Sequence, residues 1–294
     1  MPPVTRRRGR GRINPTSRNP PSSGNVGQTT TQVQQQIPVI TRPVPTATIT
    51  AEQLKDVTDK VTDRVLAQLN GANAQLPIFY SNNQDPFRVW IVGSSIVRNA
   101  FLHARKSNRG SNLDLERLGV SLWWQFKGGM KWSEVGRKVQ CLLNFEDAPD
   151  LLIIHCGGND IGDPAGSNCE LRHNMFKTIQ FLHNLLPSTR IIWSQILPRL
   201  RWRDEICHEA LEKARIRTNS FIATIIIQAG GAYIRYPEIV ELNTGMFSDD
   251  NVHLSDIGNE IFLYRIQQAI CAFVTSDTFV SPPPGESGPW LNLI

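Results

Sequence analysis

The residues Asp150-Leu-Leu-Ile-Ile-His-Cys-Gly-Gly-Asn-Asp160 carry the clearest indication of how this chain folds. Their first part, Asp150–Cys156, is a short and almost continuous apolar run, and two glycines follow it. Runs of this length, bounded by glycine, are typical of a strand buried on both faces of a parallel sheet. The stretch therefore predicts a buried central strand with a polar pair, Asn159 and Asp160, after its carboxyl end.

Four more apolar stretches and five helical stretches surround this strand in the sequence. The other strands are expected at Arg88–Val92, Gly119–Gln125, Arg190–Leu197 and Ala232–Tyr236. The helices are expected at Ile96–His103, Trp132–Leu143, Glu170–Leu186, Asp204–Gln228 and Ser255–Phe273. Strands that alternate with helices predict an α/β domain over residues 87–274, with a mainly parallel sheet of five strands covered on both faces. In such sheets, ligands bind at the carboxyl ends of the strands.

Polar groups and glycines follow the predicted strands at this edge. Gly93-Ser94-Ser95 comes after the first strand, Gly128-Gly129 after the second, Asn159 after the central one, and Asp250-Asn251-Val252-His253 before the last helix. A serine hydroxyl needs an adjacent base to act as a nucleophile, and a histidine oriented by a carboxylate is such a base. Backbone N–H groups and an Asn amide can hold the oxyanion that forms. The pattern favours nucleophilic catalysis by a serine through a tetrahedral oxyanion.

These blocks together resemble those of the SGNH/GDSL hydrolase superfamily, in the right order over about 190 residues. Gly93-Ser94-Ser95-Ile96 resembles the Gly-Asp-Ser-Leu block, Gly129 the oxyanion glycine block, Gly157–Asp160 the Gly-x-Asn-Asp block and Asp250–His253 the Asp-x-x-His block. The resemblance implies a flavodoxin-like three-layer sandwich. It also implies a serine esterase that cleaves lipid or acetyl esters without a metal or other cofactor. The roles it assigns are Ser95 as nucleophile, His253 as base and Asp250 as orienter, with the oxyanion hole formed by Ser95, Gly129 and Asn159.

One position departs from that family. Ser94 stands where the family has an aspartate that helps to order the site. The triad stays complete, but the rate, or activity itself, is put in doubt.

A second resemblance is to the esterase-like proteins of some retroelements, which join an SGNH domain to a basic arm or a coiled coil. It depends on Trp123-Trp124-Gln125, on Gly128-Gly129-Met130-Lys131-Trp132 and on the segment Leu197–Arg203. In that last segment, Arg199, Arg201, Trp202 and Arg203 follow the fourth strand. They are candidates for contact with an anionic substrate, or they form a solvated loop.

Several of these residues also have a simpler interpretation. Ser95 could instead serve simply as a helix N-cap. Asp249 is an alternative partner for His253. His155 lies within the central strand and is interpreted as a core histidine. The remaining histidines show no spacing typical of metal ligands, so no metal site is predicted.

Residues 1–49 differ in composition from the rest of the chain. The whole chain carries a net charge of +5, and the seven arginines of residues 1–50, where no acidic residue occurs, leave the remainder at −2. Without aromatic residues or a periodic apolar pattern, this segment is expected to be a disordered basic arm. Its cluster Arg6, Arg7, Arg8, Arg10 and Arg12 is a candidate contact for RNA or DNA, or a solvated tail.

The remaining segments lie on either side of the predicted domain. Residues 50–70 predict an amphipathic helix, because Leu54, Val57, Val61, Val65 and Leu69 form one apolar stripe. This helix could form a short coiled coil in a homo-oligomer, or dock on its own domain. Residues 71–86 are expected to be a linker, and residues 275–294 a flexible tail.

Cysteine usage and hydropathy bear on the cellular compartment. The five cysteines are odd in number and widely spaced, which predicts free thiols in a reducing compartment. No apolar run has the length of a membrane span, and no secretory signal is recognised. These features together favour an intracellular location, cytoplasmic or nuclear.

Overall fold

The structure, a computed structural model, describes residues 85–202 and 207–285. The predicted basic arm with its arginine cluster, the helix at 50–70, nearly all of the linker, Arg203 and the last residues of the expected tail lie outside these ranges. The five cysteines are free thiols in the structure. No helix in the described part of the chain is both long and apolar enough to cross a bilayer.

One parallel sheet forms the centre of the fold. Its strands lie in the order β2-β1-β3-β4-β5-β6. Their bounds are β1 Phe87–Gly93, β2 Val120–Phe126, β3 Leu151–His155, β4 Arg190–Ser194, β5 Ala232–Ile234 and β6 Val280–Ser281. Every pair of neighbouring strands is parallel. The first five follow the order 2-1-3-4-5 of flavodoxin-like folds, in which the chain reverses its direction of winding between β1 and β3.

The sheet corrects one expectation. The sequence predicted five strands, whereas the structure has six, because Val280 and Ser281 pair with Tyr233 and Ile234 of β5. These two residues belong to the segment expected to be a flexible tail. Two residues are too few to produce a recognisable alternation of apolar and polar side chains, so sequence periodicity could not detect this strand.

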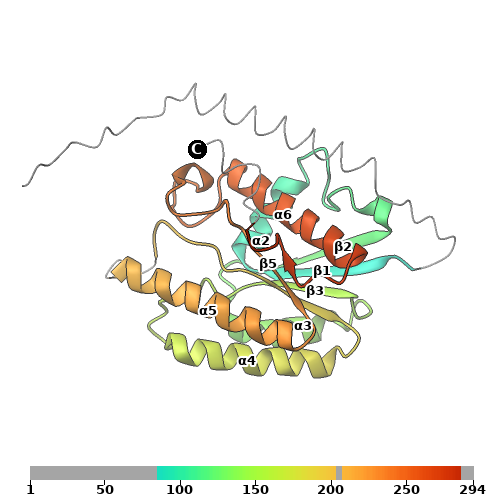
Figure 1. Cartoon of the computed structure of the whole chain (residues 1–294), viewed down its shortest axis with the longest axis horizontal. Coiled ribbons are helices and arrows are strands. Elements are labelled where there is room, and N and C mark those ends of the chain that lie inside the picture. Colours follow the sequence, from blue (N-terminus) through green and yellow to red (C-terminus); the bar gives the residue numbers. More distant parts are fainter. Residues whose placement is uncertain (1–84, 203–206, 286–294) are drawn as a thin grey trace, which may run out of the picture. The chain divides into compact units, whose positions relative to one another are not determined.

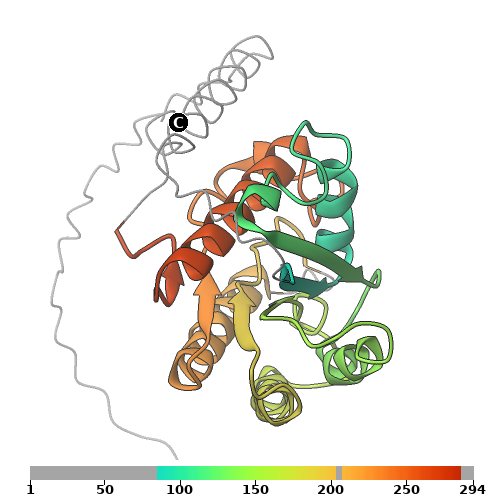
Figure 2. The same ribbon diagram turned by 90° about the vertical axis from the view of Figure 1, so that its right-hand side faces the viewer.

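The helices cover both faces of the sheet, as predicted. They are α2 Ser95–Ala104, α3 Val135–Leu142, α4 Asn168–Leu185, α5 His208–Gln228 and α6 Asp256–Thr275. Short 3₁₀ helices occur at η1 Glu116–Leu118, η2 Trp132–Glu134 and η4 Thr244–Met246. Helices α2 and α6 pack on one face, and α3, α4 and α5 pack on the other (Figures 1 and 2).

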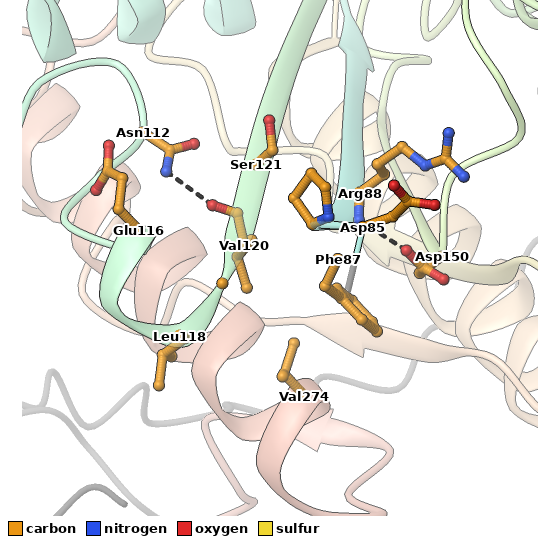
Figure 3. A pocket seen from close by; sticks show the side chains of 12 residues that line it. Asp85, Phe87, Arg88, Asn112, Glu116, Leu118, Val120, Ser121, Asp150 and Val274 are labelled. Carbon is orange, nitrogen blue, oxygen red and sulfur yellow. Dashed lines mark hydrogen bonds between the residues drawn. The ribbon is translucent and has the colours of Figure 1, made fainter. Parts of the chain in front are cut away.

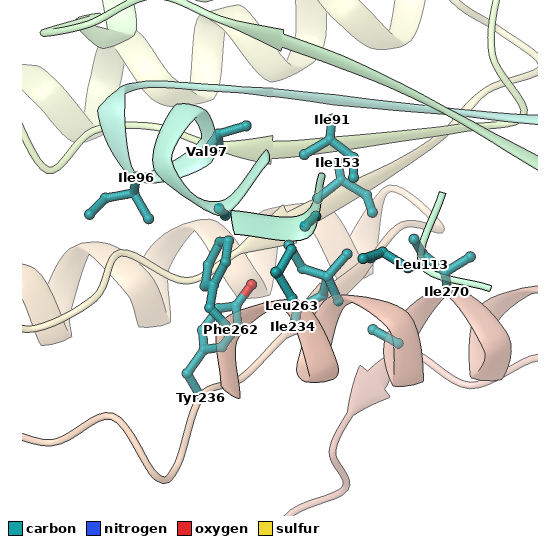
Figure 4. Packing of buried hydrophobic residues seen from close by; sticks show 14 of the residues in the cluster. Ile91, Ile96, Val97, Leu113, Ile153, Ile234, Tyr236, Phe262, Leu263 and Ile270 are labelled. Carbon is teal, nitrogen blue, oxygen red and sulfur yellow. The ribbon is translucent and has the colours of Figure 1, made fainter. Parts of the chain in front are cut away.

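Two apolar cores form because side chains alternate between the two faces of each strand. In the core under α2 and α6, Ile91 and Ile153 of the strands meet Phe262 and Leu263 of α6 (Figure 4). In the other core, Trp90 of β1 packs with side chains of α3, α4 and α5. This double burial explains why β1 and β3 have almost continuously apolar sequences.

Candidate active site

Ser95 lies at the sharp turn between β1 and α2. Ser94 is the N-cap residue of α2 in an extended conformation, and Ser95 is the first helical residue. The turn depends on Gly93, where an added Cβ would come within 2.4 Å of the carbonyl oxygen of His155 and still closer to Val97. Ser95 is half-buried. Its backbone N–H belongs to the first turn of a helix, where N–H groups have no intrahelical acceptor, so it remains available to a ligand.

Asp250 and His253 lie on one tight loop before α6. The loop closes through an antiparallel bridge between Phe247 and Leu254, and the backbone N–H of Ser248 donates to the carbonyl of His253 over 2.9 Å. The Asp250 Oδ1 accepts hydrogen bonds from the Ser248 hydroxyl and from the backbone N–H groups of Val252 and His253, at 2.8–2.9 Å. These hydrogen bonds fix the orientation of the Asp250 carboxylate toward one further partner.

That partner is the imidazole of His253. Its Nδ1 lies 2.5 Å from Asp250 Oδ2, and its Nε2 lies 2.8 Å from Ser95 Oγ. The side chains of His253 and Asp250 are 27% and 50% exposed. Burial acts to raise the pKa of Asp250, but the hydrogen bonds from the His253 side chain, the backbone and Ser248 outweigh it and hold the pKa well below its usual range. Asp250 therefore stays ionised at neutral pH. The neighbouring Asp249 is exposed, and the imidazole bonds to Asp250 instead.

The Gly128-Gly129 turn and the Asn159 loop lie side by side after β2 and β3. Gly129 is exposed and has a φ of +68°, in the left-handed region that favours glycine. The Asn159 Nδ2 donates to the carbonyl of Met130 over 3.1 Å. A side-chain amide has two N–H bonds, so the second one remains for another acceptor.

Asp160 holds these two loops together. Its carboxylate accepts the backbone N–H of Trp132 at the start of η2, with distances of 3.0 and 3.2 Å to its two oxygens. Burial raises the pKa of Asp160 to about 6. This position gives Asp160 a structural role at the site.

The segment after β4 borders the same edge. The backbone N–H of Arg201 donates to the carbonyl of Asn251, 3.0 Å away in the loop that carries His253. Arg199 donates from Nη2 to Asn159 Oδ1 over 3.0 Å. Trp202 is 2% exposed and packs in the core, so the expectation that its side chain contacts substrate directly is corrected. Arg203 lies outside the described residues.

A buried polar chain beneath the site was not anticipated from the sequence. His155 Nδ1 is 2.9 Å from Ser194 Oγ, and Ser194 Oγ is 2.6 Å from the hydroxyl of Tyr236. Burial, with the positive charge of Arg199 as a second cause, lowers the pKa of His155 to about 3. The interpretation of His155 as a satisfied core histidine is confirmed. Ser194 and Tyr236 gave no signal of their own, because a single Ser or Tyr at a strand end is common.

Two cavities lie at opposite edges of the sheet. A small one of about 20 Å³ is lined by Ser94, Ile96 and Val252, which are neighbours of the triad in sequence, and by Arg199. A large one of about 900 Å³ lies at the amino ends of β1 and β2, where Phe87, Val120 and Val274 line it together with Glu116 and Asp150 (Figure 3). The larger cavity is remote from Ser95 and His253.

Within residues 85–202 and 207–285, no group of three or more His, Cys, Asp or Glu side chains is arranged to hold a metal ion.

The known proteins to which this chain is similar are solved structures. No family model matches the chain, and no curated protein matches it. The chain is similar to the psychrotrophic esterase EstA from Pseudoalteromonas sp., with a TM-score of 0.49 and 12% identity, over 65% of this chain and 100% of that one.

Two further solved structures show a comparable similarity. A GDSL-like lipase from Bacteroides thetaiotaomicron has a TM-score of 0.45 and 18% identity, over 69% of this chain and 96% of that one. An acetyl xylan esterase from Geobacillus stearothermophilus has a TM-score of 0.46 and 14% identity, over 62% and 94%.

Proposed function

We propose that this protein is a serine ester hydrolase of the SGNH type. The observation that carries the proposal is the continuous hydrogen-bonded chain from Asp250 through His253 to Ser95, with links of 2.5 and 2.8 Å. It lies at the carboxyl edge of a parallel sheet, where such folds bind ligands. A serine that only capped α2 would have no need of a histidine oriented by a carboxylate.

In the proposed reaction, the Ser95 hydroxyl attacks the carbonyl carbon of a carboxylic ester. His253 Nε2 takes the hydroxyl proton and passes it to the departing alcohol, which leaves an acyl-enzyme on Ser95. Water then attacks the acyl group, again with His253 as base, and the carboxylic acid departs. Asp250 keeps the imidazole in the required tautomer and stabilises the imidazolium.

The oxyanion of each tetrahedral intermediate needs donors that are already in place. We assign this role to the backbone N–H of Ser95, the backbone N–H of Gly129 and the second N–H of the Asn159 amide. The proposal does not require the aspartate that Ser94 replaces, since Asp250, His253 and Ser95 are bonded to one another without it.

The test is hydrolysis of p-nitrophenyl acetate by the full chain and by Ser95→Ala. We expect turnover by the natural chain and a loss of at least about 10³-fold in kcat for the variant, because the nucleophile is gone while binding remains. Equal turnover by both proteins would refute the proposal. An Arg217→Ala variant, altered on the exposed side of α5, serves as the control for preparation effects.

A second candidate function rests on the seven arginines of residues 1–50, where no acidic residue occurs. In this alternative, the chain acts as a catalytically weak platform that binds RNA or DNA through residues 1–49 and self-associates through residues 50–70. Deletion of residues 1–49 should then abolish binding to a single-stranded oligonucleotide and its salt dependence. Binding retained after the deletion would exclude this alternative.

A further inference from the structure

Arg199 reaches across the edge of the sheet to the side chain of Asn159. It belongs to the loop after β4, whereas Asn159 follows β3, and the Nη2–Oδ1 distance is 3.0 Å. The sequence pattern gave Arg199 a different task, contact with an anionic substrate. The observed bond instead directs one arm of the guanidinium to a neighbour inside the site.

Two features hold the guanidinium in this position. Its Cζ lies 5.2 Å from the centre of the Trp202 ring, which is fixed in the core. Its path also passes Gly158, where an added Cβ would lie 2.9 Å from Nη2. A residue larger than glycine at position 158 would therefore push Arg199 away from Asn159. The contact is built by three loop residues rather than by a freely moving surface arginine.

The bond fixes which end of the Asn159 amide faces which neighbour. A guanidinium has only donors, so it must meet the oxygen of the amide and not the nitrogen. The nitrogen end then points to the Gly128-Gly129 turn, where Nδ2 already donates to Met130 over 3.1 Å. A charge-assisted bond to Oδ1 also polarises the amide and strengthens Nδ2–H as a donor.

We infer that Arg199 is a positioning residue, which acts through Asn159 by locking the amide so that its second N–H faces the oxyanion. The inference rests on the proposed esterase function and adds to it a residue outside the triad and the oxyanion hole. Trp202 and Gly158 support Arg199 in the same task.

A double-mutant cycle on p-nitrophenyl acetate tests this role. We expect Asn159→Ala to lower kcat by about 10²-fold, as loss of one oxyanion donor does. Arg199→Ala in the natural background should lower kcat roughly tenfold and leave KM for this neutral ester within about twofold, because a misoriented donor affects the transition state. In the Asn159→Ala background, the same change should cost less than about twofold, since its target is absent. Arg199→Lys, which keeps the charge and the stem, should lose less than Arg199→Ala.

Two outcomes would overturn the inference. An equal loss for Arg199→Ala in both backgrounds would mean that Arg199 does not act through Asn159. A KM that rises for an ester bearing a carboxylate, with kcat for p-nitrophenyl acetate unchanged, would return Arg199 to the role of a substrate contact. Arg217→Ala is the matched arginine control, on the exposed side of α5.

A spectroscopic measurement separates this inference from the esterase proposal. In a ¹⁵N spectrum, the side-chain amide of Asn159 is the signal missing from Asn159→Ala. It should shift in Arg199→Ala and stay in place in Arg217→Ala. If the natural chain and Ser95→Ala were equally inactive, the esterase proposal would fail, and this spectrum alone would judge the contact. An Asn159 signal unmoved by Arg199→Ala would refute the inference.

Discussion

The two edges of the sheet differ in how their polar side chains are bonded, and the volumes of their cavities do not reveal this difference. The amino edge holds the cavity of about 900 Å³, and two of its polar side chains bond to the backbone: Asp150 accepts the N–H of Arg88 over 2.7 Å, and Asn112 donates to the carbonyl of Val120 over 2.9 Å (Figure 3). The carboxyl edge holds a cavity of only about 20 Å³, yet its polar side chains are joined to one another from Asp250 to Ser95. This connection between polar side chains, and not cavity volume, is the reason that we place the proposed active site at the carboxyl edge.

The variant with the largest expected effect tests the carboxyl edge at Asp250, the proposed orienting carboxylate. Asp250→Asn keeps the shape of the loop but removes the charge that fixes the His253 tautomer. We expect kcat for p-nitrophenyl acetate to fall by about 10³–10⁴-fold. Asp249→Asn is the matched control on the adjacent exposed residue and should change kcat by less than about twofold. A greater loss for Asp249→Asn than for Asp250→Asn would make Asp249 the orienting residue.

A smaller effect concerns Asp160, the buried carboxyl that joins two loops at the reactive edge. The pKa of an aspartate in an unfolded chain is about 3.9, whereas burial raises that of folded Asp160 to about 6. Because the folded value is the higher one, the folded chain loses stability as the pH rises through this window. Asp160→Asn cannot ionise. Its free energy of unfolding relative to the natural chain should therefore increase by about 2–3 kcal/mol between pH 4 and pH 7.

Urea unfolding of both proteins at several pH values measures this difference. The other ionisable groups are shared, so they cancel in the comparison of the two proteins. A difference that stays constant from pH 4 to pH 7 would contradict a raised pKa for Asp160.

The smallest expected effect is at the amino edge. Glu116→Gln and Ser121→Ala alter the lining of the large cavity without touching the bonded chain at the other edge. We expect kcat/KM for p-nitrophenyl acetate to stay within about twofold of the natural value for both. A loss of tenfold or more in either variant would link the large cavity to catalysis and reverse the comparison.

The sequence predicted the layered fold well because its signals are local. The apolar runs of β1 and β3, and the alternation of strands with helices, follow directly from burial on both faces of the sheet. The residues Ser95, Asp250 and His253 could also be proposed, since each stands in a short block beside a recognisable element. Strand β6 escaped because its two residues carry no pattern.

The contacts between loops could not be predicted. The bond from Arg199 to Asn159 joins residues 40 positions apart, and the burial of Trp202 depends on how the segment after β4 folds back. Both depend on the three-dimensional course of loops, which periodicity does not describe. The same limit applies to the chain from His155 through Ser194 to Tyr236.

Because the loop from Phe247 to Leu254 is closed, only one contact between remote parts of the sequence has to form to complete the proposed site. The proposed base and its orienter are three residues apart on one turn, so they move as a unit, while the proposed nucleophile lies 158 positions away in the sequence. Helix α2 begins at Ser95, α6 begins just after His253, and the two helices pack together; His103 of α2 also meets Glu260 of α6 over 3.1 Å. The interface between α2 and α6 therefore sets the distance between Ser95 and His253. On warming, a displacement of α2 relative to α6 would abolish the proposed activity, while the Asp250–His253 unit and most of the sheet remained intact.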